Sequence, residues 1–203
     1  EVCNVSSWPE FRHPDKVNSI TDDVVEKMVN TINSARRPLL FVGAGIIESK
    51  AEKLLFDLAT TNNIPVTSTL RGLGCFPPDN HLYVGMIGMH GTRYANQLME
   101  EADVVIALGV RFDDRATGKI NEFCPHAKVI HVDIDKSEIN KLKATYQSVN
   151  ANIKDVLELI LPHIMENKRK SWLKEVEIKK LAMPYVKAPE NGDIFHPLKI
   201  INE

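Results

Sequence analysis

Short, continuous apolar runs separated by amphipathic segments constrain the fold of this chain more than any other feature. Pro38–Val42 and Val104–Leu108 are unbroken apolar runs, a pattern typical of strands that are buried on both faces of a sheet. Between such runs, apolar residues recur at helical spacing. Strands that alternate with helices need crossover connections, so the sequence predicts an α/β fold. We expect a Rossmann-like open parallel sheet of about six strands with helices on both faces.

The remaining elements are expected from the same alternation. Apolar residues at helical spacing predict a helix from residue 19 to about 35, with Asp22 and Asp23 in its first turn. The other expected strands are 64–67, 128–133 and 147–149. The other expected helices carry Leu54 to Ala59, Tyr94 to Met99, 137–142, 153–164 and the charged tail 166–182.

The chain divides into three parts by composition. Residues 1–18 hold two prolines and no periodicity, so they are expected to be an incoming linker. Residues 19–165 are predicted to form one central domain, since 203 residues suffice for one substantial core. Residues 166–203 are expected to be an outgoing helix and linker toward an absent C-terminal domain. Both ends therefore suggest a piece of a longer polypeptide.

Composition excludes several functional classes. A net charge of −2 and a pI near 6.4 provide no basic field for nucleic acid. The three cysteines lack CxxC spacing, and no histidine spacing suggests ligands, so neither a disulfide framework nor a metal site is expected. No apolar run has the length of a membrane span or the form of a secretory signal. We therefore expect a soluble cytoplasmic protein, or one of an organelle stroma or matrix in a eukaryote.

The first predicted strand runs directly into Gly43, Ala44 and Gly45. Glycines there let the backbone turn tightly and approach phosphate oxygens at a helix N-terminus, although such a triplet is more often a plain strand-to-helix turn. A dinucleotide fingerprint needs a third small residue where Glu48 stands. It also needs an acid where the second strand ends in Thr67-Ser68-Thr69. Both departures weigh against an ordinary NAD site.

A densely charged segment follows the strand Val104–Leu108. Residues 109–118 include Arg111, Asp113, Asp114 and Arg115. In a ligand-binding loop, the guanidinium groups can clamp phosphates while the aspartates fix their orientation. The alternative is a solvated patch of surface salt bridges, which contributes little.

The strand 128–133 ends in an acid that suits a ribose. Asp133 can accept hydrogen bonds from ribose hydroxyls, whereas Asp135 either does the same or caps the helix that follows. His90 is assigned to ligand contact, because no serine, cysteine or acid nearby forms a triad with it. No residue of this chain is predicted to be catalytic.

Five motifs occur in order along the chain: GAGI at 43–46, TSTLRGLG at 67–74, GMHG at 88–91, GVRFDDRATGK at 109–119 and HVDID at 131–135. Together they resemble the middle domain of acetolactate synthase, also called acetohydroxyacid synthase, over residues 38–164. Members of that family condense two pyruvates, or pyruvate with 2-oxobutyrate, in branched-chain amino-acid biosynthesis. They use thiamine diphosphate and Mg²⁺, and their middle domain binds FAD, which has no redox role in the net reaction.

The resemblance implies specific contacts. Met89, Asp114 and Arg115 resemble the mouth of the family's substrate channel, where sulfonylurea-type inhibitors lodge. Asn152 stands where many members have an aspartate, and it can still bond an adenine or ribose edge. The implied FAD-binding residues are Gly43, Ala44, Gly45, Thr69, Leu70, Arg71, Ile87, Gly88, Met89, His90, Gly109, Val110, Arg111, Asp113, Arg115, Asp133, Ile134 and Asn152.

The same resemblance implies what this chain lacks. The family's thiamine site needs a glutamate from a preceding domain and a GDG…N metal motif from a following one, and neither occurs here. The fragment is therefore expected to be inactive alone. Expected partners are the flanking thiamine-binding domains, further copies in a homo-oligomer and, as a possible addition, a regulatory subunit. The alternatives are a non-catalytic nucleotide-binding module of the same fold or an NAD-dependent dehydrogenase domain.

Overall fold

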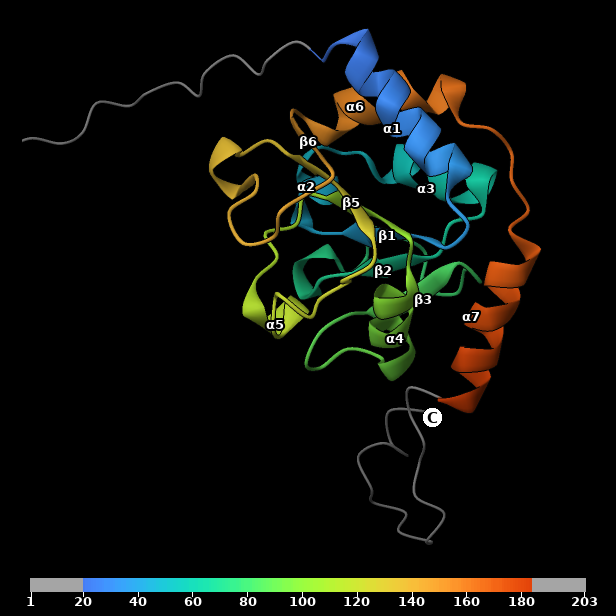
Figure 1. The fold of residues 1–203 in the computed structure, drawn as a ribbon. Coiled ribbons are helices and arrows are strands. Elements are labelled where there is room, and N and C mark those ends of the chain that lie inside the picture. The colour runs from blue at the N-terminus through green and yellow to red at the C-terminus, as the bar shows by residue number, and fades with distance from the viewer. Residues whose placement is uncertain (1–19, 184–203) are drawn as a thin grey trace, which may run out of the picture.

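The computed structural model describes residues 20–183 and contains one parallel six-stranded sheet (Figure 1). Its strand order is β3-β2-β1-β4-β5-β6, so the chain winds outward in both directions from β1 and β4. This order is that of a doubly wound Rossmann fold, as the sequence predicts. The strands are β1 (Pro38–Val42), β2 (Val66–Ser68), β3 (Tyr83–Met86), β4 (Val104–Leu108), β5 (Lys128–Asp133) and β6 (Gln147–Asn150).

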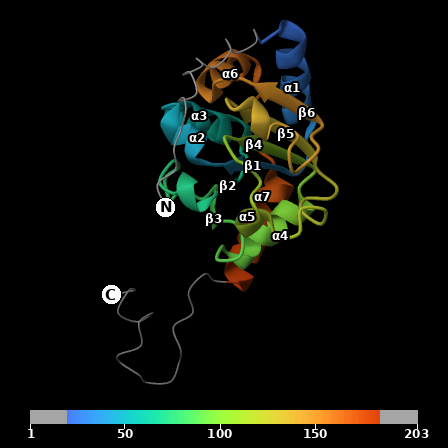
Figure 2. The same cartoon turned by 90° about the vertical axis from the view of Figure 1, so that its left-hand side faces the viewer.

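Helices cover both faces of the sheet. Figures 1 and 2 show α1, α3 and α6 on one side and α4 with α7 on the other. The α-helices are α1 (Asp22–Ser34), α2 (Ala44–Glu48), α3 (Glu52–Asn62), α4 (Arg93–Glu101), α5 (Asp114–Thr117), α6 (Ile153–Ile160) and α7 (Lys170–Ala182). Single 3-10 turns lie at η1 (Leu70–Gly72), η2 (Lys136–Glu138) and η3 (Leu161–His163).

Successive residues of the central strands enter two separate hydrophobic cores. In β1, Leu40 and Val42 pack against α1, α3 and α6, whereas Leu39 and Phe41 pack on the side of α4 and α7. Because side chains alternate across a strand, a strand covered on both faces must be apolar throughout. The whole of β1 and of β4 is buried, which explains their unbroken apolar runs.

Two local predictions differ from the structure. Strand β3 was not predicted. It is a short edge strand interrupted by Gly85 with φ of +79°, and its pairing with β2 shifts register. The helix expected at 137–142 is wrong, since only the η2 turn forms. Asn140 adopts a left-handed conformation, and its side chain accepts hydrogen bonds from Thr145, which ends the helical path.

The tail predicted to be helical packs on the domain as α7. The side chain of Trp172 in this helix is buried against the domain, and its indole Nε1 donates to the carbonyl of Pro38 at 2.9 Å. The predicted linker 1–18 and the last part of the outgoing segment, 184–203, lie outside the described residues. Within residues 20–183, none of the helices combines the length and apolar character that crossing a lipid bilayer requires.

Candidate functional site

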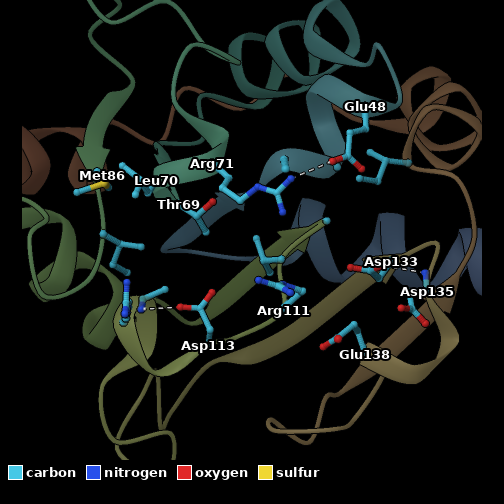
Figure 3. Close-up of a pocket in the computed structure, with 18 of the residues that line it drawn as sticks. Glu48, Thr69, Leu70, Arg71, Met86, Arg111, Asp113, Asp133, Asp135 and Glu138 are labelled. Carbon is cyan, nitrogen blue, oxygen red and sulfur yellow. Dashed lines mark hydrogen bonds and ion pairs between the residues drawn. The ribbon is translucent and has the colours of Figure 1, made fainter. Parts of the chain in front are cut away.

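One cavity of about 1100 Å³ lies at the carboxyl edge of the sheet (Figure 3). The first residue after β1 and the first residue after β4 each still form a backbone hydrogen bond with the neighbouring strand. The N–H of Gly43 donates to Leu108 at 3.0 Å, and the N–H of Gly109 donates to Val132 at 2.9 Å. The segments that follow β1, β4 and β5 therefore begin side by side, at the place where open α/β sheets bind ligands.

Nearly every residue implied as FAD-binding or channel-lining lines this cavity. The exceptions are Gly43 and Gly88, which are buried beneath it. The residues that do line it are Ala44, Gly45, Thr69, Leu70, Arg71, Ile87, Met89, His90, Gly109, Val110, Arg111, Asp113, Asp114, Arg115, Asp133, Ile134 and Asn152. Further lining residues that were not predicted are Glu48, Ser49, Met86, Ala116, Asp135, Glu138 and Ile153.

The glycines after β1 also have a packing role that the sequence analysis did not predict. A Cβ on Gly43 would lie 2.1 Å from the carbonyl oxygen of Gly109, and one on Gly45 would lie 2.8 Å from the Gly109 Cα. Gly109 has a φ of +62°, and a Cβ there would lie 2.6 Å from the Gly45 Cα. These glycines let two loops of the carboxyl edge come into contact. This contact was not predicted from the sequence.

A second pair of loops meets at Gly88. Gly88 has a φ of +102°, and a Cβ there would lie 2.3 Å from the carbonyl oxygen of Arg115. The N–H of Met89 donates to that same carbonyl at 3.0 Å. The amide side chain of Asn96, which was not predicted as important, bonds both the N–H and the C=O of Gly88. The loop that carries Met89 and His90 is thus fixed against α5, which carries Arg115.

The arginines of the site have unused donors. Among residues 20–183, the guanidinium groups of Arg111 and Arg115 form no ion pair or hydrogen bond, and both side chains are exposed. Arg71 forms an exposed ion pair with Glu48 at 3.5 Å. Glu48 is the residue that stands where a dinucleotide fingerprint would need a small side chain. Figure 3 shows Arg71 and Arg111 extending into the middle of the cavity. Three cationic groups therefore face one space that a polyanion could fill.

The expected role of the aspartates in orienting these arginines is wrong. The carboxylate of Asp113 instead accepts the N–H of Ala116 at 3.3 Å and caps α5. Helix N-termini leave such N–H groups without intrahelical acceptors, and an aspartate cap satisfies one of them. The segment 109–118 is therefore a loop followed by one capped helical turn.

Asp133 and Asp135 have different environments. Asp133 is 7% exposed, and its Oδ1 accepts the N–H of Asp135 at 2.8 Å. Burial raises the pKa of Asp133, with smaller contributions from the negative charges of Asp135, Glu138 and Glu48. Asp135 is exposed and accepts hydrogen bonds from Ser137, which lower the pKa of its carboxyl. Of the two roles left open for Asp135, the structure supports that of a cap.

Asn152 is also a cap. Its Oδ1 accepts the N–H of Lys154 at 2.9 Å at the start of α6, so its carbonyl oxygen is already engaged. Its amide nitrogen remains available to the cavity that it lines. Among the described residues, no three histidine, cysteine, aspartate or glutamate side chains come together as metal ligands.

A comparison with models of known protein families identifies the family of this chain. The family model described as "Thiamine pyrophosphate enzyme, central domain" matches residues 25–160. The chain belongs to this family. The matched range runs from α1 to the end of α6 and contains every residue that lines the cavity.

Relatives of this central domain share one name. The acetolactate synthase large subunit of Cyanidium caldarium is 41% identical over 186 residues, covering 88% of this chain and 32% of the relative. The acetolactate synthase isozyme 1 large subunit of Escherichia coli K12 is 38% identical over 84% of this chain and 30% of the relative. Acetolactate synthase 1 of Zea mays, named as chloroplastic, is 48% identical over 67% and 21%. The chain thus spans about a third or less of these curated relatives.

Proposed function

We propose that this chain is the central, FAD-binding domain of an acetolactate synthase. In this proposal the whole enzyme is a carboligase that condenses two pyruvates, or pyruvate with 2-oxobutyrate, in branched-chain amino-acid biosynthesis. The observation that carries the proposal is the cavity at the carboxyl edge of the sheet, which is lined by cationic, acidic and apolar groups. The shared name of the relatives supports the choice of enzyme.

The residues of the cavity fit FAD. A volume of about 1100 Å³ suits a large cofactor, since ligand pockets commonly run from ~300 to ~1,000 Å³. Arg71 and Arg111 lie in the middle, where they would bond a pyrophosphate. Asp133 and Glu138 lie at one end and would accept hydrogen bonds from ribose hydroxyls, and the apolar Met86 lies at the other end, where it would contact the flavin ring.

In this proposal the chain binds and orients, and it performs no bond-making step. When bound, FAD would supply a rigid ring that braces the substrate channel and the domain interface, without passing electrons. Met89, Asp114 and Arg115 would line the mouth of that channel, where Arg115 can attract an anionic substrate. Thiamine diphosphate and Mg²⁺ would be held by flanking domains of the same polypeptide outside residues 1–203. Further copies of the enzyme and a regulatory subunit are proposed as partners.

Cofactor binding tests the proposal directly. The purified chain is titrated with FAD, with ADP and with NAD, and its melting temperature and flavin absorbance are followed. We expect FAD to raise the melting temperature more than ADP does, since only a ligand that binds the folded state stabilises it. The opposite ranking, or stabilisation by NAD in place of FAD, would support a non-flavin nucleotide module or a dehydrogenase domain.

The predicted lack of catalytic activity in the isolated chain is tested separately. The chain is incubated with pyruvate, thiamine diphosphate and Mg²⁺, and acetolactate is assayed. We expect none, because the fragment lacks the glutamate and the GDG…N motif that the resemblance requires for the thiamine site. Formation of acetolactate by the chain alone would overturn this part of the proposal.

A further inference from the structure

His131 is a fully buried polar residue that the proposed function does not use. It lies in β5, is 0% exposed, and its Nε2 lies 2.9 Å from the carbonyl oxygen of Val110. A carbonyl only accepts, so Nε2 carries the proton and donates it. The other ring nitrogen, Nδ1, is buried without any hydrogen-bond partner.

Such an arrangement is costly for a core position. An unpaired buried nitrogen loses its hydration without compensation, and an apolar side chain of similar size would avoid that loss. Among the described residues, the one hydrogen bond of this ring is the bond to Val110, and its Nε2 also lies 3.9 Å from Oδ2 of Asp133. The hydrogen bond reaches from β5 to the loop that follows β4.

The bonded loop carries Arg111 into the cavity. Arg111 is exposed, whereas its neighbours Val110 and Phe112 are 2% and 3% exposed. Phe112 has a φ of +54°, a left-handed conformation that costs a non-glycine residue energy and persists only where the surroundings hold it. The ring of His131 meets the ring of Phe112 edge-on at a centroid distance of 5.0 Å. His131 thus contacts the residues on both sides of Arg111.

We infer that His131 is a positioning residue, which holds the loop 110–112 in the shape that points Arg111 at the ligand. This inference rests on the proposed binding of FAD, and His131 itself is not one of the residues that line the cavity. Its effect on the ligand should pass through Arg111.

Paired amide substitutions separate the hydrogen bond from the bulk of the ring. The amide nitrogen of glutamine can take the place of the imidazole Nε2, whereas that of asparagine takes the place of Nδ1. His131→Gln therefore keeps the donor for Val110, and His131→Asn removes it. We expect His131→Asn to raise the dissociation constant of FAD about tenfold and His131→Gln to raise it less than about threefold.

A double-mutant cycle tests whether His131 acts through Arg111. In an Arg111→Ala background, we expect His131→Asn to change the FAD dissociation constant by less than about twofold. A tenfold loss in both backgrounds would overturn the inference, as would equal losses for the Asn and Gln variants or no loss for either.

Gln147 offers a matched control. It is also buried, its Nε2 donates to the backbone carbonyl of Val24 at 2.8 Å, and its Oε1 is unpartnered. This bond lies on β6 and α1, away from the cavity. We expect Gln147→Leu to lower the melting temperature and to leave the FAD dissociation constant within about twofold. A loss equal to that of His131→Asn would show a general effect of stability and defeat the inference.

Other outcomes are also decisive. If the wild-type chain binds no FAD, the proposed function fails and the inference fails with it. Binding by the wild type with equal behaviour of the His131 variants defeats the inference alone. Should His131→Asn not fold, the ¹⁵N shifts of the wild-type imidazole decide. The inference requires the Nε2–H form with and without FAD, and an Nδ1–H form would overturn it.

Discussion

Two arginines of this domain occupy opposite environments. Arg169, at the start of α7, is 7% exposed and donates to the carbonyl of Ile32 at 2.9 Å, to the carbonyl of Ala35, and to both oxygens of Asn62. Arg111 is exposed at the cavity and has no hydrogen bond or ion pair among the described residues. A guanidinium group saturated by its own chain holds the fold together, whereas one with free donors can bind a ligand.

The position of Arg169 explains its saturation. It meets the C-terminal ends of α1 and α3, whose last carbonyls have no intrahelical partner and carry the negative end of each helix dipole. Burial lowers the pKa of Arg169 to about 10, so the group stays charged at neutral pH. The same residue begins the helix that buries Trp172 on the other face of the sheet. Arg169 therefore ties the two helical layers together.

The largest effect should come from removing the saturated arginine. Arg169→Ala leaves several buried oxygens unpaired, so we expect the free energy of unfolding to fall by about 3 to 5 kcal/mol. Urea denaturation measures the change. Arg37→Ala is the control, since Arg37 pairs with Glu175 of α7 at an exposed site and should matter by less than about 1 kcal/mol. Equal losses in the two variants would remove the distinction between the arginines.

The backbone beneath the cavity should be the next most sensitive place. Gly109→Ala would put a Cβ into Gly45, so we expect a loss of about 2 to 4 kcal/mol in the free energy of unfolding. Gly118 also has a φ of +62°, but no atom lies within 4 Å of the place that an alanine methyl group would take, so Gly118→Ala should cost only about 1 to 2 kcal/mol. Chemical denaturation measures both variants. If the two variants lost equal free energy of unfolding, the contact with Gly45 would not be the reason that position 109 needs glycine.

Removing the open arginine should affect binding rather than folding. Arg111→Ala deletes a charge-assisted bond to an anionic ligand, so we expect FAD binding to weaken by about 1 to 3 kcal/mol. The free energy of unfolding without FAD should change by less than about 0.5 kcal/mol. Fluorescence titration measures the affinity, and Arg36→Ala, at an exposed position before β1, is the control. An unchanged titration would count against the pyrophosphate assignment.

The smallest effect concerns the acidic end of the cavity. The raised pKa of Asp133 means that the folded state binds its proton more tightly than the unfolded state does, so the ionised carboxylate costs stability at neutral pH. Asp133→Asn should therefore raise the free energy of unfolding at pH 8 by less than about 1 kcal/mol. The gain should shrink as the pH falls through the raised pKa of this carboxyl, because the carboxyl then gains its proton. A gain independent of pH, in urea melts across that range, would exclude the charge as its cause.

Much of the fold follows from local sequence. Burial can be predicted from the apolar runs of β1 and β4 and from the apolar face of α6. The reason is that strands and helices repeat their buried positions at fixed periods. The candidate site follows almost as directly, since parallel strands all end at one edge and the residues after them must gather there. That these residues hold FAD stays a prediction.

Other features depend on contacts that only the folded chain makes. No local pattern distinguishes Arg169 from Arg111, because the acceptors of Arg169 come from α1 and α3, more than a hundred positions away along the chain. The need for glycine at 109 likewise arises from its contact with Gly45. Local patterning specifies the sheet, its buried strands and the edge where polar residues collect. Which charges are satisfied, and which stay open to a ligand, depends on contacts between distant segments that periodicity does not record.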